Sequence, residues 1–578
     1  MRSTFREIAK REIDRHSVIS FDVFDTLLLR PYVSPGDLFR HVEVCEEAES
    51  FEKERRDAES RAYKKNQDGD CINFDDIYAE IDEKFRHLKD VEASMEEKVI
   101  RANEEMRMLF EYALYKNKTV VIASEMYLPG DLIERILSKN GYTGYSKLFV
   151  SSDLRASKWT GRLYDAIISY TRVDPREILH IGDNPTADVK RSRSKGMTAL
   201  LYEKVIDRFL SCNRYAKRFR SLMKNDLEAS ILLGVTAMHW NTKVVNGNED
   251  YWTDFGYRYG GAVCAGYMRF ISKKASEEKC DVVAFVSRDG YTLEKLFTPS
   301  GSVKKSYIHA QRTINLLTSL KYKDEKEARH IVDFFGKEND VVRALSEKKL
   351  TASAMIDSER ELFERLAEEA RGNYASYMRN ILGDPDKIML TDLITTTFSA
   401  QRALHDTIDA KIHGCYFSVR GNEKNDEYEH SVYHPVRSDD SVRRIVPYLE
   451  LLLTSPQLPL AGISKEGHPV YADNIDPHER FWASVYPSIS EGIIKFSNDL
   501  NDIFGEHAPS FRNDIVTKWL NIQTNLPSDD DIENLSKVRW TFEATHTEYY
   551  PLMQNPVKRI IRNAFGDLVD LVKFKRYL

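Results

Sequence analysis

Short apolar runs, each followed by polar residues and then by a helical pattern, recur along the first two hundred positions. The runs at residues 18–22, 118–123, 147–150 and 177–181 are rich in β-branched residues and predict buried strands. A shorter run at 199–201 predicts a last strand. Because alternating strands and helices build a parallel sheet, residues 1–205 are predicted to form a Rossmann-like α/β domain.

The first two predicted strands are separated by a long segment with a different pattern. Residues 36–116 are rich in Glu, Lys, Arg and Ala, with apolar residues at helical spacing. This predicts three to five helices that interrupt the sheet, as an inserted cap over about 34–116. A basic amphipathic stretch at 206–226 predicts a helix that connects the first domain to the rest of the chain.

The order of strand, loop and helix returns in the second part of the chain. Apolar runs at 280–286, 306–310, 387–392 and 411–418 predict further strands. We therefore expect a second α/β domain over residues 227–475. Residues 476–578 are helical and aromatic in pattern and predict a C-terminal helical region.

Composition narrows the class of protein. The 578 residues include 84 basic and 91 acidic ones, so the formal net charge of −7 gives no bulk attraction to nucleic acid. The 6 cysteines lack metal-binding spacing, which is typical of free thiols in a reducing compartment. Residues 1–16 lack the apolar core of a signal peptide, and no stretch has the length and apolarity of a membrane span. We therefore expect a cytoplasmic protein.

Polar side chains with catalytic potential stand at the ends of the predicted strands. Asp22 and Thr26 follow the first strand, Ser124 and Glu125 the second, and Asp183 and Asp188 the fourth, while Lys158 lies in the loop after the third. Carboxyl ends of parallel strands meet at one edge of a sheet, where ligands bind. We therefore expect these side chains to share one site.

This ordered set, with the run Gly182-Asp183-Asn184, resembles the four motifs of the haloacid dehalogenase (HAD) superfamily over the first third of the chain. The resemblance implies that Asp22 is a nucleophile that forms an aspartyl-phosphate. It implies a Mg²⁺ ion held by Asp22, Asp183, the Phe24 carbonyl and Asp188. It further implies that Ser124 and Lys158 bind the phosphoryl group and that Thr26 orients the loop.

One position departs from the pattern of that superfamily. Its phosphatases carry a second aspartate two residues after the nucleophile, where this chain has Phe24. Asp25 stands one residue later, at a position where the family usually has glycine. The proton for the leaving group could then come from Asp25, Glu125, a cap residue or no residue at all. Dehalogenases of the superfamily also have an aromatic residue here, so displacement at carbon is an alternative.

Two loops of the second domain are candidates for substrate binding. The loop at 287–290 contributes Arg288 and Asp289, and the loop after the strand at 387–392 contributes Thr395 and Thr396. The loop at 287–290 and the segment at 450–456, with its spacing E-x-x-x-T-x-P, resemble those of long bacterial HAD proteins associated with surface-polysaccharide synthesis and glycosyltransferases.

These patterns favour a Mg²⁺-dependent phosphatase or phosphotransferase that acts on a phosphorylated sugar, a glycerol-type compound or a nucleotide-activated precursor. A second hypothesis places the main activity, glycosyl or glycerol-phosphate transfer, in the second domain. A third is a non-catalytic scaffold that binds a phosphorylated ligand. The expected partners are small molecules rather than nucleic acid. The basic residues at 557–578 also suggest peripheral contact with an anionic membrane.

Overall fold

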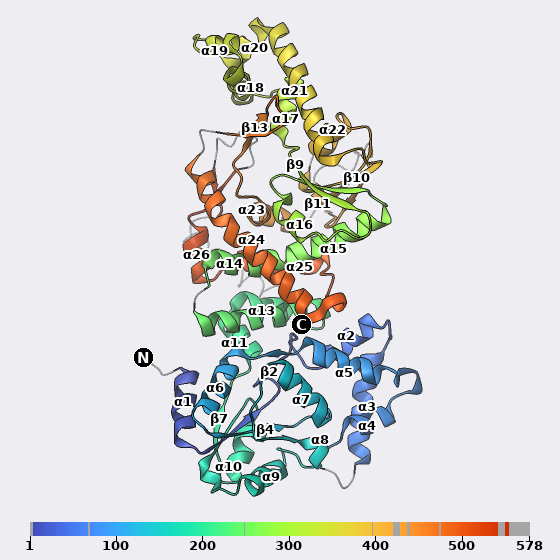
Figure 1. Ribbon diagram of the computed structural model, residues 1–578, viewed down its shortest axis with the longest axis vertical. Helices are drawn as coiled ribbons and strands as arrows, with labels where there is room; N and C mark the ends of the chain where they lie inside the picture. Colours follow the sequence, from blue (N-terminus) through green and yellow to red (C-terminus); the bar gives the residue numbers. More distant parts are fainter. Residues whose placement is uncertain are drawn as a thin grey trace, which may run out of the picture. The chain divides into compact units, whose positions relative to one another are not determined.

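The computed structural model describes residues 4–66, 70–247, 249–395, 397–419, 428–435, 440–472, 476–541 and 549–553 (Figure 1). The chain forms two compact units. The first comprises Met1–Glu249 and Asn498–Pro509, and the second comprises Asp250–Ser497 and Ser510–Leu578. The predicted basic segment at 557–578 lies outside the described residues.

A five-stranded parallel sheet forms the centre of the first unit. Its order is β5-β4-β1-β6-β7, and its strands are β1 (Val18–Asp22), β4 (Thr119–Ser124), β5 (Lys147–Val150), β6 (Ile178–Gly182) and β7 (Thr198–Leu201). All five residues of β1 and of β6 are buried, because these strands have neighbours on both sides and helices on both faces. The predicted strands and their parallel arrangement are confirmed.

The predicted helical insertion is also present. It contains α2 (Asp37–Cys45), α3 (Phe51–Lys65), α4 (Phe74–Glu80) and α5 (Leu88–Val99), which are drawn in blue in Figure 1. The next helix, α6 (Glu104–Tyr115), packs on β4 and α1 (Phe5–Arg15). The centroid of its Phe110 ring lies 5.7 Å from the centroid of the Phe21 ring of β1. Within the segment at 34–116, α6 therefore packs on the sheet.

The remaining helices of the first unit cover the sheet or follow it. They are α7 (Gly130–Lys139), α8 (Ser151–Leu154), α9 (Arg162–Thr171), α10 (Ser192–Ser194), α11 (Val205–Cys212), α12 (Arg214–Leu222) and α13 (Leu227–Asn246). The single connecting helix expected at 206–226 is two helices, because the backbone of Asn213 is extended and ends α11. Both pack against α13, so this segment belongs to the first unit.

The second unit contains another five-stranded parallel sheet, of order β12-β11-β10-β8-β9. Its strands are β8 (Val282–Val286), β9 (Lys304–Ile308), β10 (Lys387–Thr395), β11 (Lys411–Val419) and β12 (His430–Val432). The strand β10 extends three residues past the predicted end at Asp392, because Ile394 and Thr395 continue the pairing with β11. The predicted α/β class is thus confirmed in both units.

Helices surround the second sheet. They include α15 (Gly261–Glu277), α16 (Gly290–Leu296), α17 (Arg312–Ser319), α21 (Arg360–Leu382), α22 (Ser399–His405), α23 (Asp440–Leu452), α24 (Pro477–Phe504), α25 (Asn513–Asn525) and α26 (Asp529–Leu535). Figure 1 shows α18 (Glu325–Glu338), α19 (Asp340–Ser346) and α20 (Ala352–Ser358) gathered around one end of α21. These helices share an apolar cluster that includes Ile331, Phe335 and Phe363. Among the described residues no helix has the length and apolarity needed to cross a membrane.

Candidate active site of the first unit

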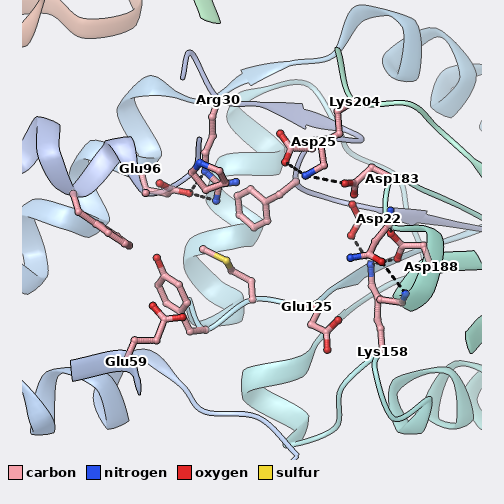
Figure 2. Close-up of a pocket in the computed structure, with 18 of the residues that line it drawn as sticks. Asp22, Asp25, Arg30, Glu59, Glu96, Glu125, Lys158, Asp183, Asp188 and Lys204 are labelled. Carbon is pink, nitrogen blue, oxygen red and sulfur yellow. Dashed lines mark hydrogen bonds and ion pairs between the residues drawn. The ribbon is translucent and has the colours of Figure 1, made fainter. Parts of the chain in front are cut away.

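The carboxyl ends of β1, β4 and β6 bring the predicted residues together. Asp22 is the last residue of β1, Ser124 is the last of β4, and Asp183 follows β6 directly. Asp22 pairs with Ala123 across the sheet, so these polar side chains emerge at the same level of neighbouring strands. Figure 2 shows Asp22, Asp183 and Asp188 grouped on one side of a cavity, with Lys158 beside them.

Lys158 is the cation at the centre of this group. Its ammonium donates to Asp22 Oδ1 and, at 2.8 Å, to Asp188 Oδ1. The side chain is only 1% exposed, and the loop before α9 carries it to the carboxyl end of the sheet. A buried lysine is stable as a cation only beside anions. Accordingly, although burial disfavours its charge, Asp188 and Asp22 raise the pKa of Lys158 well above its usual range.

A second lysine, which the sequence analysis did not select, also joins the site. The ammonium of Lys204 lies 2.9 Å from Asp25 Oδ2 and 3.1 Å from Asp183 Oδ2. Lys204 follows β7 by three residues, so its position after a predicted strand was the available signal. Asp25 has a φ of +58°, a left-handed conformation that aspartate tolerates better than most residues. This explains how aspartate occupies a position where glycine is usual.

Besides Lys158, two neighbours orient Asp188: His180 within β6 and Asn184 in the segment after it. The Asp188 carboxylate accepts from the Asn184 N–H at 2.9 Å and contacts His180 Nε2 at 3.1 Å. His180 in turn contacts Ser20 Oγ at 2.8 Å. A Cβ at Gly182 would stand 2.4 Å from Asp188 Cγ, so glycine is required there for the carboxylate to reach Lys158. His180 was also missed, although a polar residue within a buried strand is a recognisable signal.

Several polar atoms of the first unit have no hydrogen-bonding partner among the residues that the structure describes. They are Asp22 Oδ2, Thr26 Oγ1 and Ser124 Oγ, all buried. Buried polar atoms are nearly always paired, so the unpaired oxygen of Asp22, which lines the cavity, indicates a place where a ligand can bind.

The carboxylates fit a divalent cation. Oxygen atoms of Asp22, Asp183 and Asp188 all lie within 4.8 Å of one another. Together with Asp25 they bring four formal negative charges, against which Lys158 and Lys204 supply two positive ones. Hard oxygen ligands with a surplus of two negative charges suit Mg²⁺. Burial raises the pKa of Asp22 to about 7 and also raises the pKa of Asp183, although Lys158 and Lys204 oppose this effect.

The cavity continues beyond this charged group. It has a volume of about 370 Å³, and its lining includes Phe24, Arg30, Glu96 and Glu125. Arg30 donates to Glu96 at 2.8 Å, and its guanidinium lies 4.1 Å from the centroid of the Phe24 ring. Figure 2 shows the Arg30–Glu96 pair on the side of the cavity opposite Asp188 and Lys158. Phe24 thus offers an apolar ring covered by the Arg30 guanidinium, and it cannot donate a proton.

Two carboxylates that could replace the missing aspartate differ in their surroundings. Asp25 is held by Lys204, as described above. Glu125 lines the cavity and accepts from the Trp159 N–H at 3.2 Å. Burial raises the pKa of Glu125, and this effect is partly offset by that N–H and by Lys158.

The candidate residues of the second unit lie apart from this site, in a cavity of their own. Arg288, Asp289 and Thr395 line a cavity of about 450 Å³ at the carboxyl end of the second sheet. Thr395 Oγ1 accepts from the Phe398 N–H at 2.9 Å, so this hydroxyl already stabilises the loop before α22. Thr396 lies outside the described residues. The segment at 450–456 also reaches this cavity, through Glu450 and Thr454.

Asp392 lines this cavity, and the effect of burial on its carboxyl group can be tested through the pH dependence of stability. Burial raises the pKa of Asp392 to about 6, so the folded protein binds a proton there more tightly than the unfolded chain. Stability from this group is therefore gained as pH falls from about 6 to about 4. We expect Asp392→Asn to stabilise the protein by about 1 kcal/mol at pH 8 and to have no effect near pH 4. Thermal denaturation across this pH range measures the difference, and a constant difference would contradict it.

Comparisons with known proteins were made for the whole chain. No protein-family model matches the sequence, and no curated protein matches it. Solved structures do match over about a third of the chain. One is a predicted phosphoglycolate phosphatase from Haemophilus somnus 129PT, with 14% identity over 32% of this chain and 85% of the other, at a TM-score of 0.25.

Two other solved structures match a similar share of this chain. A 2-haloacid dehalogenase from Pseudomonas syringae pv. tomato DC3000 is 17% identical over 32% of this chain and 86% of its own, with a TM-score of 0.26. A HAD family enzyme from Bacteroides thetaiotaomicron, crystallised with magnesium and inorganic phosphate, is 11% identical over 33% of this chain and 95% of its own, with a TM-score of 0.25.

Proposed function

We propose that the first unit is a Mg²⁺-dependent phosphoryl-transfer enzyme in which Asp22 is the nucleophile. The observation that carries the proposal is Asp22 Oδ2, which is buried and has no hydrogen-bonding partner among the described residues, while Lys158 donates to Asp22 Oδ1. Lys158 fixes one carboxylate oxygen and leaves the other to attack phosphorus. The substrate is a phosphorylated small molecule such as a sugar phosphate, a glycerol-type compound or a nucleotide-activated precursor.

Each neighbouring group has a defined task in this proposal. Asp22, Asp183 and Asp188 would hold Mg²⁺, which neutralises phosphate charge when it is bound. The Ser124 hydroxyl donates to a phosphoryl oxygen, and Lys158 balances the charge that develops on the transferring group. Asp188, held by Lys158 and His180, keeps Lys158 in place. Although burial alone would raise the pKa of Asp188, Lys158 and His180 hold it below its usual range.

The Phe24 surface and the Arg30–Glu96 pair limit the leaving group. A phosphate ester with a flat or apolar leaving group could pack against the Phe24 ring, whereas the cavity of about 370 Å³ excludes polymers from its interior. The direct test is phosphate release from a library of phosphorylated metabolites, with Mg²⁺ and with EDTA. Release that requires Mg²⁺ supports the proposal. Absence of release from every member, or release of halide from haloacids in EDTA, would contradict it.

Glu125 is the group that we expect to protonate the leaving group. Glu125→Gln should lower kcat about 10²-fold for an alkyl phosphate, whose leaving group needs a proton, and should change kcat less than about threefold for p-nitrophenyl phosphate. The measurement is a comparison of kcat for the two substrates. Asp25→Asn is the matched control, and a leaving-group-dependent loss in that variant instead would assign the proton transfer to Asp25.

Lys204 is expected to compete with the metal for Asp183. Its ammonium lies 3.1 Å from an oxygen that the metal would use, so its removal adds one uncompensated negative charge at the site. Lys204→Met should therefore tighten Mg²⁺ binding by about tenfold. Isothermal titration calorimetry without substrate measures this change. Unchanged or weaker binding would show that Lys204 supports the metal site instead.

A further inference from the structure

The second unit has its own cavity, which takes no part in the chemistry at Asp22. It lies where β8, β9 and β10 end and is closed by α23 and α24. In parallel α/β sheets, ligands bind at the carboxyl ends of the strands. The volume of about 450 Å³ lies within the range of sites for small molecules.

The arginine that sequence analysis selected for phosphate binding is already paired. Arg288 NH1 donates to Glu479 Oε2 at 2.7 Å, and the Glu479 side chain is only 2% exposed. Glu479 comes from α24, so this pair joins α24 to the loop after β8. A guanidinium bound in this way has its charge compensated, and the cavity gains no net attraction for an anion.

The cavity lining contains three acidic side chains, besides the guanidinium groups of Arg288 and Arg312. Asp289, Asp392 and Glu450 come from the loop after β8, from β10 and from α23. Burial, Asp392 and Glu450 raise the pKa of Asp289 well above its usual range, against the opposing effect of Arg288. These three carboxyl groups offer no positive charge to a phosphate group, so the phosphate site expected around Arg288 and Thr395 is not favoured.

Three other polar atoms in the cavity wall have no hydrogen-bonding partner within the described part of the chain. They are Thr313 Oγ1, Trp482 Nε1 and Gln311 Oε1. Thr313 is 6% exposed and Trp482 is 5% exposed. The Trp482 nitrogen can only donate, the Gln311 oxygen can only accept, and the Thr313 hydroxyl can do both. A matching ligand must therefore supply both donors and acceptors.

We propose that this cavity binds an uncharged, hydroxyl-rich group of the size of a sugar. Hydroxyl groups donate to carboxylates and to the Gln311 oxygen, and they accept from the Trp482 N–H. A phosphate offers mainly acceptors and meets no positive charge on the three carboxyl groups. An alkylammonium ion can donate to them but offers no acceptor to Trp482. The proposal is independent of the activity proposed for Asp22.

Saturation-transfer NMR on the full-length protein tests the proposal. The probes are glucose, N-acetylglucosamine and ribitol, compared with inorganic phosphate and putrescine. We expect at least one polyol to bind the wild-type protein and Asp22→Asn equally. Glu450→Gln and Thr313→Val should each weaken this binding at least tenfold, and the exposed control Glu364→Gln should leave it unchanged.

Two results would overturn the proposal. One is that no polyol binds, or that polyol binding is the same in wild type, Glu450→Gln and Thr313→Val. The other is that putrescine binds and Glu450→Gln abolishes this binding, or that phosphate binds and Thr313→Val weakens this binding, because the cavity would then select a charged ligand. Near-ultraviolet circular dichroism of each variant confirms that the fold is retained. Thr313→Val removes one hydroxyl at nearly constant volume, so it tests the cavity without changing its charge.

Discussion

Replacement of Asp22 by asparagine is expected to reduce Mg²⁺-dependent phosphate release by about 10³-fold or more. The change removes the attacking oxygen while it preserves the size of the side chain, so the transition state loses its nucleophile. It also removes one of the carboxylates gathered for the metal. The measurement is kcat on whichever phosphorylated substrate the wild-type enzyme hydrolyses, together with mass spectrometry of the protein quenched in acid during turnover.

The mass measurement separates a role of Asp22 as nucleophile from a role in metal binding alone. A nucleophilic Asp22 gives a phosphorylated protein in the wild type and none in Asp22→Asn. Asp25→Asn is the matched control, because it makes the same chemical change three residues away, at a carboxylate held by Lys204. We expect that control to keep its phosphorylated form. Phosphorylated Asp22→Asn protein, or activity within tenfold of wild type, would contradict the assignment.

Replacement of Lys158 by methionine is expected to have the largest effect on stability. Lys158 is the buried cation between Asp22 and Asp188, and methionine would leave both carboxylates without that partner. Loss of one member of a buried ion pair costs about 3–5 kcal/mol. We expect a loss of about 3 kcal/mol at pH 8, measured by hydrogen exchange of the β1 and β6 amides.

The loss of stability in Lys158→Met should depend on pH, because Lys158 lowers the pKa of the neighbouring carboxyl group of Asp188. In the wild type the pKa of Asp188 is held low, so its contribution to stability is present above pH 4 and is lost in more acidic solution. Without Lys158 the carboxyl groups become protonated more readily, so the difference between variant and wild type should shrink as pH falls from 8 to 5. The control is Lys190→Met, at an exposed lysine of the same unit. A pH-independent loss would indicate a packing effect instead.

Much of the first unit could be predicted from local pattern. The apolar runs before Asp22, Ser124 and Asp183 have the length and branching of buried strands, and each ends in a polar residue. Strand ends of a parallel sheet meet at one edge, so the order of these residues along the chain was enough to predict their meeting. The helices after residue 36 were equally visible from their spacing.

Lys204 and His180 could not be assigned in this way, because their roles depend on contacts across the sheet. Lys204 bridges Asp25 and Asp183, which are 158 residues apart in sequence and belong to the loops after β1 and β6. His180 points between Ser20 and Asp188, and only the pairing of β1 with β6 brings these together. Side-chain partners of this kind follow from register and packing.

The sequence alone determined the α/β class, the parallel sheets and the group around Asp22, since periodicity and strand ends are local properties of the chain. The tertiary structure decided which charges compensate one another. It paired Lys158 with Asp22 and Asp188, tied Asp25 to Lys204 and bound Arg288 to Glu479. Charge compensation depends on distances of about 3 Å between residues far apart in sequence, and folding alone sets those distances.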